Sequence, residues 1–143
     1  MATPDFNALW LHYPDVSKPC DGRWANQCAI RMSVALNAEK TVTVSKTTYT
    51  EPKCAHGHAR GAESLANWLY RKIGRPRMFK DGGTAKEKLA SQSGIIFFKN
   101  CFTRAGEHRR IGDHIDLWKN GSVTPIGYDD PRNHAEAVWF WKL

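Results

Sequence analysis

The sequence predicts an α+β domain in which helices come first and an antiparallel sheet follows. Residues 26–38 and 62–72 carry apolar side chains at helical spacing. After Gly94 the pattern changes to apolar runs and to alternation of polar and apolar residues, which are typical of strands. Asn120-Gly121 favours a tight hairpin turn, because both residues tolerate positive φ. Helices and strands that are segregated along the chain indicate an α+β architecture.

The expected helices differ in how much surface they bury. A short helical turn is expected near Phe6–Leu11. The helix at Asn26–Ala38 has few polar positions, so most of it should be buried, with Cys28 in its first turn. The helix from Ala62 to about Lys72 has apolar residues on one face and ends before Gly74.

A shorter third helix is expected between the second helix and the sheet. It begins at Thr84, where Thr84 and Glu87 fit a capping box, and Gly94 closes it. Extended structure is expected at residues 41–50, 95–98, 114–118, 122–126 and 137–143.

Length and composition indicate one folded domain over residues 1–143. The chain is 41% hydrophobic and 24% charged, which is typical of globular proteins, and it contains no repeat or long linker. The net charge of +7 favours polyanionic surroundings such as nucleic acid, anionic lipid or an anionic cell wall. Charge alone does not select among these partners.

Targeting, membrane and metal signals are not found in the sequence. No apolar run approaches the roughly 20 residues of a membrane-spanning helix, so no membrane insertion is expected. The first residues have neither the basic nor the apolar region of a signal peptide, which predicts either cytoplasmic residence or export by another route. The four cysteines form no CxxC pair, and no metal or cofactor is predicted.

Cys28 and His114 are the candidate catalytic pair. A thiol at the start of a helix has a lowered pKa because of the helix dipole, and the N–H groups of the first turn can stabilise an oxyanion. A thiol nucleophile needs a base, and His is the usual one. His114 is expected to start a strand, where its side chain can project at the rim of the sheet. Considered singly, a buried inert Cys and a surface His are the more common cases.

Two segments around these residues resemble a known family. Asn26-Gln27-Cys28-Ala29-Ile30-Arg31-Met32-Ser33 and Gly112-Asp113-His114-Ile115-Asp116-Leu117-Trp118 are similar to the two signature segments of the fourth family of type VI secretion amidase effectors. The resemblance covers most of residues 6–124 and fades after Ile126.

The resemblance implies a papain-like fold of the NlpC type, with the Cys on a central helix packed against an antiparallel sheet. It implies hydrolysis of the bond between γ-D-glutamate and meso-diaminopimelate in peptidoglycan stem peptides. It also implies export by the type VI secretion machinery, action in the periplasm of rival Gram-negative cells, and inhibition by a cognate immunity protein. Asn26, Gln27 and Asp116, which flank the catalytic pair in the two segments, are the candidates for substrate binding.

The third catalytic group is less well defined than the pair. The family carries an Asp about where this chain has Thr124-Pro125, and Pro cannot orient an imidazole. Asp129 is favoured as the replacement, with Asp130 and Asp116 as alternatives.

Several alternatives remain open at the level of sequence. Cys54 and Cys101 would form a reasonable disulfide in an oxidising periplasm, or both are thiols. A basic run from Arg71 to Lys80 would suit a nucleic-acid-binding module, although no nucleic-acid motif is present and no nucleic-acid partner is predicted. A papain-like hydrolase or acyl transferase acting on another amide is the third hypothesis.

Overall fold

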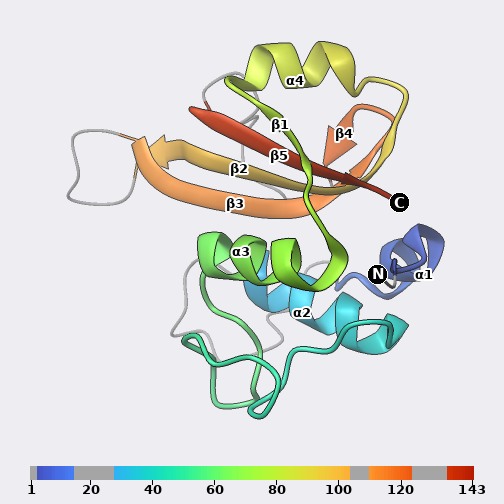
Figure 1. Cartoon of the computed structure of the whole chain (residues 1–143), viewed down its shortest axis with the longest axis vertical. Coiled ribbons are helices and arrows are strands. Elements are labelled where there is room, and N and C mark those ends of the chain that lie inside the picture. The colour runs from blue at the N-terminus through green and yellow to red at the C-terminus, as the bar shows by residue number, and fades with distance from the viewer. Residues whose placement is uncertain (1–2, 15–27, 104–109, 124–134) are drawn as a thin grey trace. The chain divides into compact units, whose positions relative to one another are not determined.

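The computed structural model describes residues 3–14, 28–103, 110–123 and 135–143. The chain divides into two compact units, one made of Met1–Arg75 with Leu143 and the other of Pro76–Lys142. Among the described residues, the first unit holds three helices and the second holds a sheet with one helix (Figure 1). The expectation that residues 1–143 act as a single domain stays a prediction.

The helices of the first unit are α1 (Phe6–His12), α2 (Cys28–Glu39) and α3 (Ala62–Ile73). All three were expected near these positions. The α1 helix begins at an N-cap, Asp5, whose carboxylate accepts from the N–H of Ala8 at 2.9 Å. The Asp5 N–H in turn donates to the Glu39 carboxylate at 2.9 Å, which ties the start of α1 to the end of α2.

The α2 helix is buried along most of its length, as its composition predicts. Seven of its residues are buried, among them the polar Ser33. The Ser33 hydroxyl donates to the Ala29 carbonyl at 2.8 Å and accepts from the Ala59 N–H at 3.0 Å. This hydroxyl therefore joins α2 to the loop that precedes α3, and both of its hydrogen bonds are buried.

The expectation of extended structure at residues 41–50 is wrong, because this segment forms turns. The Asn37 amide bonds both the N–H and the carbonyl of Val44, at 2.6 and 2.9 Å. The hydroxyls of Ser45 and Thr48 bond nearby backbone groups. Such short-range bonds satisfy the backbone without a partner strand, so β-branched composition alone misassigned the segment.

The second unit contains a five-stranded sheet with the order β1-β5-β2-β3-β4, in which all the described strand pairs are antiparallel. Its strands are β1 (Arg77–Phe79), β2 (Ser93–Thr103), β3 (Arg110–Lys119), β4 (Ser122–Val123) and β5 (Ala137–Lys142). Helices followed by an antiparallel sheet confirm the predicted α+β class. The strand β1 was not predicted, and residues 124–126 of the expected fourth strand lie outside the described residues.

The helix α4 (Gly82–Lys88) covers one face of this sheet (Figure 1). Its N-cap is Asp81, whose carboxylate accepts from the Thr84 N–H at 2.7 Å and from the Thr84 hydroxyl at 3.0 Å. The predicted capping box is therefore wrong, since Thr84 lies inside the helix. Beneath α4, the Trp118 indole donates to the Leu89 carbonyl at 2.9 Å. The core of this face consists of Ala85, Leu89, Ile96, Phe98, Cys101, Trp118, Ala135, Val138 and Phe140.

The predicted turn at Asn120-Gly121 and the predicted helix end at Gly94 have different outcomes. The hairpin turn is confirmed, because Asn120 and Gly121 have φ of 50° and 89° and join β3 to β4. Gly94 does not end a helix as expected. It lies in β2, where an added Cβ would come within 1.9 Å of the Trp141 carbonyl oxygen. The glycine is needed there because β5 passes too close for any side chain.

Candidate functional site

Cys28 is the first residue of α2 and is 3% exposed. At this position the thiol lies at the positive end of the helix dipole. The first turn of a helix also presents N–H groups that the helix itself does not bond, and these suit a developing negative charge. The expected location of Cys28 at the start of a buried helix is thus observed.

His114 lies within β3 and is 2% exposed. The expectation that it would begin a strand at the rim is wrong, because β3 already starts at Arg110. Alternation of polar and apolar residues is the usual pattern of a half-buried strand, yet every residue from Gly112 to Trp118 is buried. The alternation of polar and apolar residues arises here from a buried polar pair and not from exposure to water.

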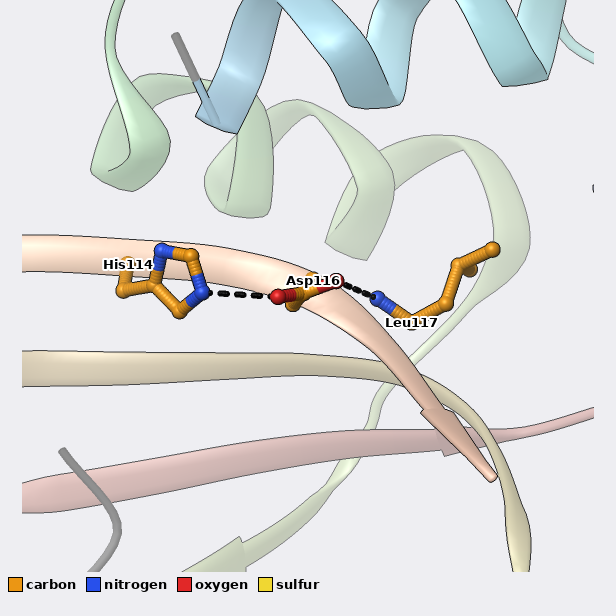
Figure 2. Close-up of polar contacts among 3 residues, drawn as sticks. All are labelled: His114, Asp116 and Leu117. Carbon is orange, nitrogen blue, oxygen red and sulfur yellow. Dashed lines mark hydrogen bonds and ion pairs between the residues drawn. The ribbon is translucent and has the colours of Figure 1, made fainter. Parts of the chain in front are cut away.

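That polar pair consists of His114 and Asp116, which lie two residues apart on the same face of β3 (Figure 2). The His114 Nε2 and the Asp116 Oδ2 are 2.8 Å apart, and Asp116 is fully buried. The other carboxylate oxygen accepts from the Leu117 N–H at 2.7 Å. Both oxygens of Asp116 are therefore engaged within β3, which suits a residue that orients the imidazole better than one that contacts substrate.

The hydrogen bond defines which imidazole nitrogen can act as a base. A carboxylate only accepts hydrogen bonds, so an ionised Asp116 receives the Nε2–H of His114. The neutral imidazole then carries its lone pair on Nδ1. A nearby carboxylate also favours the imidazolium that forms when Nδ1 takes up a proton. In this arrangement Nδ1 of His114 can accept a proton and later donate it.

Phe98 supports the imidazole from the neighbouring strand. It is paired with His114 across β2 and β3, and the two rings are stacked, with centroids 6.2 Å apart and an interplanar angle of 10°. Residues 95–98 were expected to be extended, but the contact of Phe98 with His114 was not predicted. Only the strand register, which the sequence does not contain, reveals this contact.

A Cys–His contact within the loop before α3 was not predicted. The Sγ of Cys54 is 3.7 Å from the Nδ1 of His58. Burial lowers the pKa of His58, and the neighbouring His56 lowers it further. Cys54 packs against Ile30 of α2. The spacing of four residues across a Gly-containing loop was the signal that could have indicated this contact.

The remaining predicted site residues have mixed outcomes. Asp129 and Asp130, together with Asn26 and Gln27, lie outside the described residues, so their roles stay predictions. Cys54 and Cys101 are buried thiols in different units and are not joined to each other by a disulfide.

In the part of the chain that the structure describes, no group of three or more His, Cys, Asp or Glu side chains is arranged to hold a metal ion. None of the described helices has the length and apolar character to span a bilayer.

Comparison with known proteins shows to which protein family the chain belongs. Residues 24–141 match the family described as type VI secretion system (T6SS) amidase effector protein 4, or Tae4. The chain therefore belongs to the Tae4 family and is a T6SS amidase effector. No curated protein matches the sequence.

Solved structures of Tae4 proteins have the same fold. Tae4 of the Salmonella typhimurium Tae4/Tai4 effector–immunity system is 20% identical, with a TM-score of 0.73 over 99% of both chains. Tae4 in the Tae4–Tai4 complex from Enterobacter cloacae is 18% identical, with a TM-score of 0.69 over 99% of both chains. Tae4 from Enterobacter cloacae alone is also 18% identical, with a TM-score of 0.71 over 99% of this chain and 98% of that one. The NlpC-type α+β fold predicted from the sequence is confirmed.

Proposed function

We propose that this amidase effector hydrolyses the bond between γ-D-glutamate and meso-diaminopimelate in peptidoglycan stem peptides, with Cys28 as nucleophile and His114 as acid and base. Family membership supports the amidase class. The observation that carries the chemistry is the buried His114–Asp116 pair, at 2.8 Å, in a chain that also has a thiol at the start of a buried helix. The net charge of +7 is consistent with an anionic wall substrate.

The first half of the proposed reaction forms an acyl-enzyme. His114 Nδ1 takes the thiol proton, and the Cys28 thiolate attacks the amide carbonyl carbon. The carbonyl oxygen becomes an oxyanion, for which the backbone N–H of Cys28 is the proposed donor. When the tetrahedral intermediate collapses, the C–N bond breaks and the imidazolium gives its proton to the leaving amine of meso-diaminopimelate.

The second half releases the glutamyl product. His114 removes a proton from water, which attacks the thioester carbonyl, and the C–S bond then breaks. The Cys28 sulfur leaves and takes the proton back from the imidazolium, and the product retains a new carboxyl group. No redox step and no cofactor is needed, because each proton lost by a nucleophile is returned to a leaving group.

Asp116 is the proposed orienting residue of this site. By accepting from Nε2, it holds the tautomer that leaves Nδ1 basic, and it stabilises the imidazolium in both halves of the reaction. The sequence favoured Asp129 for this role, whereas the observed contact supports Asp116. Asn26 and Gln27 stay the candidates for substrate contact.

The proposed biological setting is contact-dependent killing of Gram-negative bacteria. We infer delivery by the T6SS into the periplasm of the target cell, where cross-linked peptidoglycan lies. The related Tae4 structures from Salmonella typhimurium and Enterobacter cloacae include complexes with the immunity protein Tai4. A cognate immunity protein of this kind is the proposed partner in the producing cell.

The test is digestion of purified sacculi and of free stem tetrapeptide, followed by mass spectrometry of the products. Wild-type protein should yield fragments that end at γ-D-glutamate and begin at meso-diaminopimelate, whereas Cys28→Ala should yield none. Cys54→Ala is the matched control, because it removes another buried thiol of the first unit and should retain activity. Cleavage of a different amide would refute the substrate, and activity of Cys28→Ala would refute the nucleophile.

A further inference from the structure

The strand β2 contains a bulge directly beyond the residue that pairs with His114. Phe98 is opposite His114, but the next pair along the ladder is Phe102 with Gly112. Three residues of β2, 99–101, therefore face Asp113 alone. Asn100, in the middle of the bulge, has a φ of 51° in the left-handed region, which Asn tolerates better than most residues.

Asp113 closes this bulge with its side chain. Its Oδ1 accepts from the N–H of Asn100 at 2.9 Å, and the residue is only 8% exposed. The carboxylate thus takes the place that a backbone carbonyl of β3 would have in a regular ladder. Since Asp113 precedes His114 directly, the two side chains point to opposite faces of the strand.

The bulge is also held from its other side, at the start of β5. The side-chain amide of Asn100 donates to the Glu136 carboxylate. The Glu136 N–H donates to the Lys99 carbonyl at 2.9 Å. The backbone of the bulge is therefore attached to both neighbouring strands, and the attachment to β3 is made by Asp113.

The geometry of His114 depends on where the regular ladder ends. Regular pairing runs from Ser93–Lys119 to Phe98–His114 and stops there. Within it, His114 is stacked on Phe98 and bonded to Asp116. A slip of β3 by one residue would turn both polar side chains to the other face of the sheet. A fixed bulge at residues 99–101 opposes such a slip, because its extra residues fit only one register.

We infer that Asp113 is a positioning residue for His114, which rests on the proposed function of that histidine. In this assignment Asp113 acts through the backbone of the bulge and is not one of the reacting groups. Its carboxylate accepts a hydrogen bond from the Asn100 backbone and so fixes the bulge. The bulge fixes the register of β2 and β3, and this register places the imidazole against Phe98 and Asp116.

The test compares Asp113→Ala, Asp113→Asn and Asp113→Glu in the full chain. Asn keeps an oxygen that can accept from Asn100, whereas Ala removes it and Glu moves the carboxylate by one methylene. The Asp113→Ala and Asp113→Glu variants should lower kcat on stem tetrapeptide at least tenfold and change KM less than twofold. The Asp113→Asn variant should retain most of the wild-type kcat. Glu87→Gln, which removes an exposed carboxylate on α4, is the charge-matched control and should behave as wild type.

The second readout is the ¹⁵N spectrum of the His114 ring, which needs no turnover. In the Asp113→Ala and Asp113→Glu variants the single Nε2–H tautomer of His114 should become a mixture, whereas Asp113→Asn should keep the single tautomer. If Asp113→Ala fails to fold, Asp113→Glu tests the same point with the charge kept. The inference is overturned if folded Asp113→Ala or Asp113→Glu keeps the wild-type kcat and tautomer, or if Asp113→Asn loses both. Wild-type protein that cleaves no stem peptide would refute the proposed function, while the ring spectra would still test the positioning.

Discussion

Replacement of Asp116 by Ala is the sharpest test of the proposed site. The change removes a fully buried carboxylate that accepts from His114 Nε2 at 2.8 Å and from the Leu117 N–H at 2.7 Å. Without it, nothing in this pair selects the tautomer with basic Nδ1. The imidazolium that forms during each half-reaction also loses its counter-charge.

The expected loss of activity follows from the strength of that bond. A hydrogen bond to a charged group contributes about 1.5–3 kcal/mol. Because about 1.4 kcal/mol corresponds to a factor of ten in rate, kcat should fall about 10- to 150-fold. Two buried donors lose their acceptor at the same time, which should lower the free energy of unfolding by about 2–6 kcal/mol. A domain in the middle or upper part of the usual stability range, about 5–15 kcal/mol, remains folded after such a loss.

The assay is steady-state hydrolysis of stem tetrapeptide, accompanied by urea unfolding to establish that the variant is folded. Asp129→Asn is assayed in parallel, because the sequence favoured Asp129 as the third catalytic residue. We expect Asp116→Ala to lose kcat with little change in KM, and Asp129→Asn to stay within about threefold of wild type. The opposite ranking, with folded Asp116→Ala active and Asp129→Asn inactive, would refute the assignment of Asp116.

Two further predictions concern stability. Burial lowers the pKa of His58, with His56 contributing, so the unfolded chain binds more protons than the folded chain as the pH falls below about 6.5. The free energy of unfolding should therefore decrease from pH 7.5 to pH 5, and the decrease should be smaller in His58→Gln. Urea unfolding of both proteins at both pH values measures this difference, and equal decreases would contradict this account. Gly94→Ala should destabilise by about 3 kcal/mol or more, because its Cβ would lie 1.9 Å from the Trp141 carbonyl oxygen. Urea unfolding of Gly94→Ala against Gly83→Ala, whose nearest contact is at 3.5 Å, measures that cost, and equal stability would show that β5 can move away.

The elements that sequence patterns predicted well are those whose signals are local. Apolar spacing and a following glycine located α3, whose C-cap Gly74 has a φ of 109°. Asn120-Gly121 located the turn between β3 and β4 for the same reason, since its conformation depends on two adjacent residues. The helix α2 needed only its composition, because a helix with few polar positions has to be buried.

The failures arose where a side chain from elsewhere decided the conformation. The Asn37 amide holds Val44 in a turn, which the Thr- and Val-rich composition of residues 41–50 does not reveal. Asp81 competes successfully with Thr84 for the N-cap of α4. Gly94 resembles a helix terminator in the sequence, but it is required by the close approach of β5, which is distant along the chain.

The candidate site was predicted in part for the same reason. Alternation along a strand puts His114 and Asp116 on one face, so Asp116 was a foreseeable candidate. Its full burial and its bond to Nε2 were not foreseeable, because they depend on the residues that cover the strand. The bulge at Asn100 depends on the pairing of β2 with β3, which no local pattern encodes.

The brevity of β1 has a consequence for how the protein behaves in solution. This strand forms one border of the sheet and spans only three residues, with Arg77 over the ring of Phe79 at 5.1 Å. A foreign strand that docked along this border would find few backbone groups to bond and would have to displace a cation from its aromatic neighbour. On this side the described sheet is therefore protected against edge-to-edge polymerisation of one copy on another.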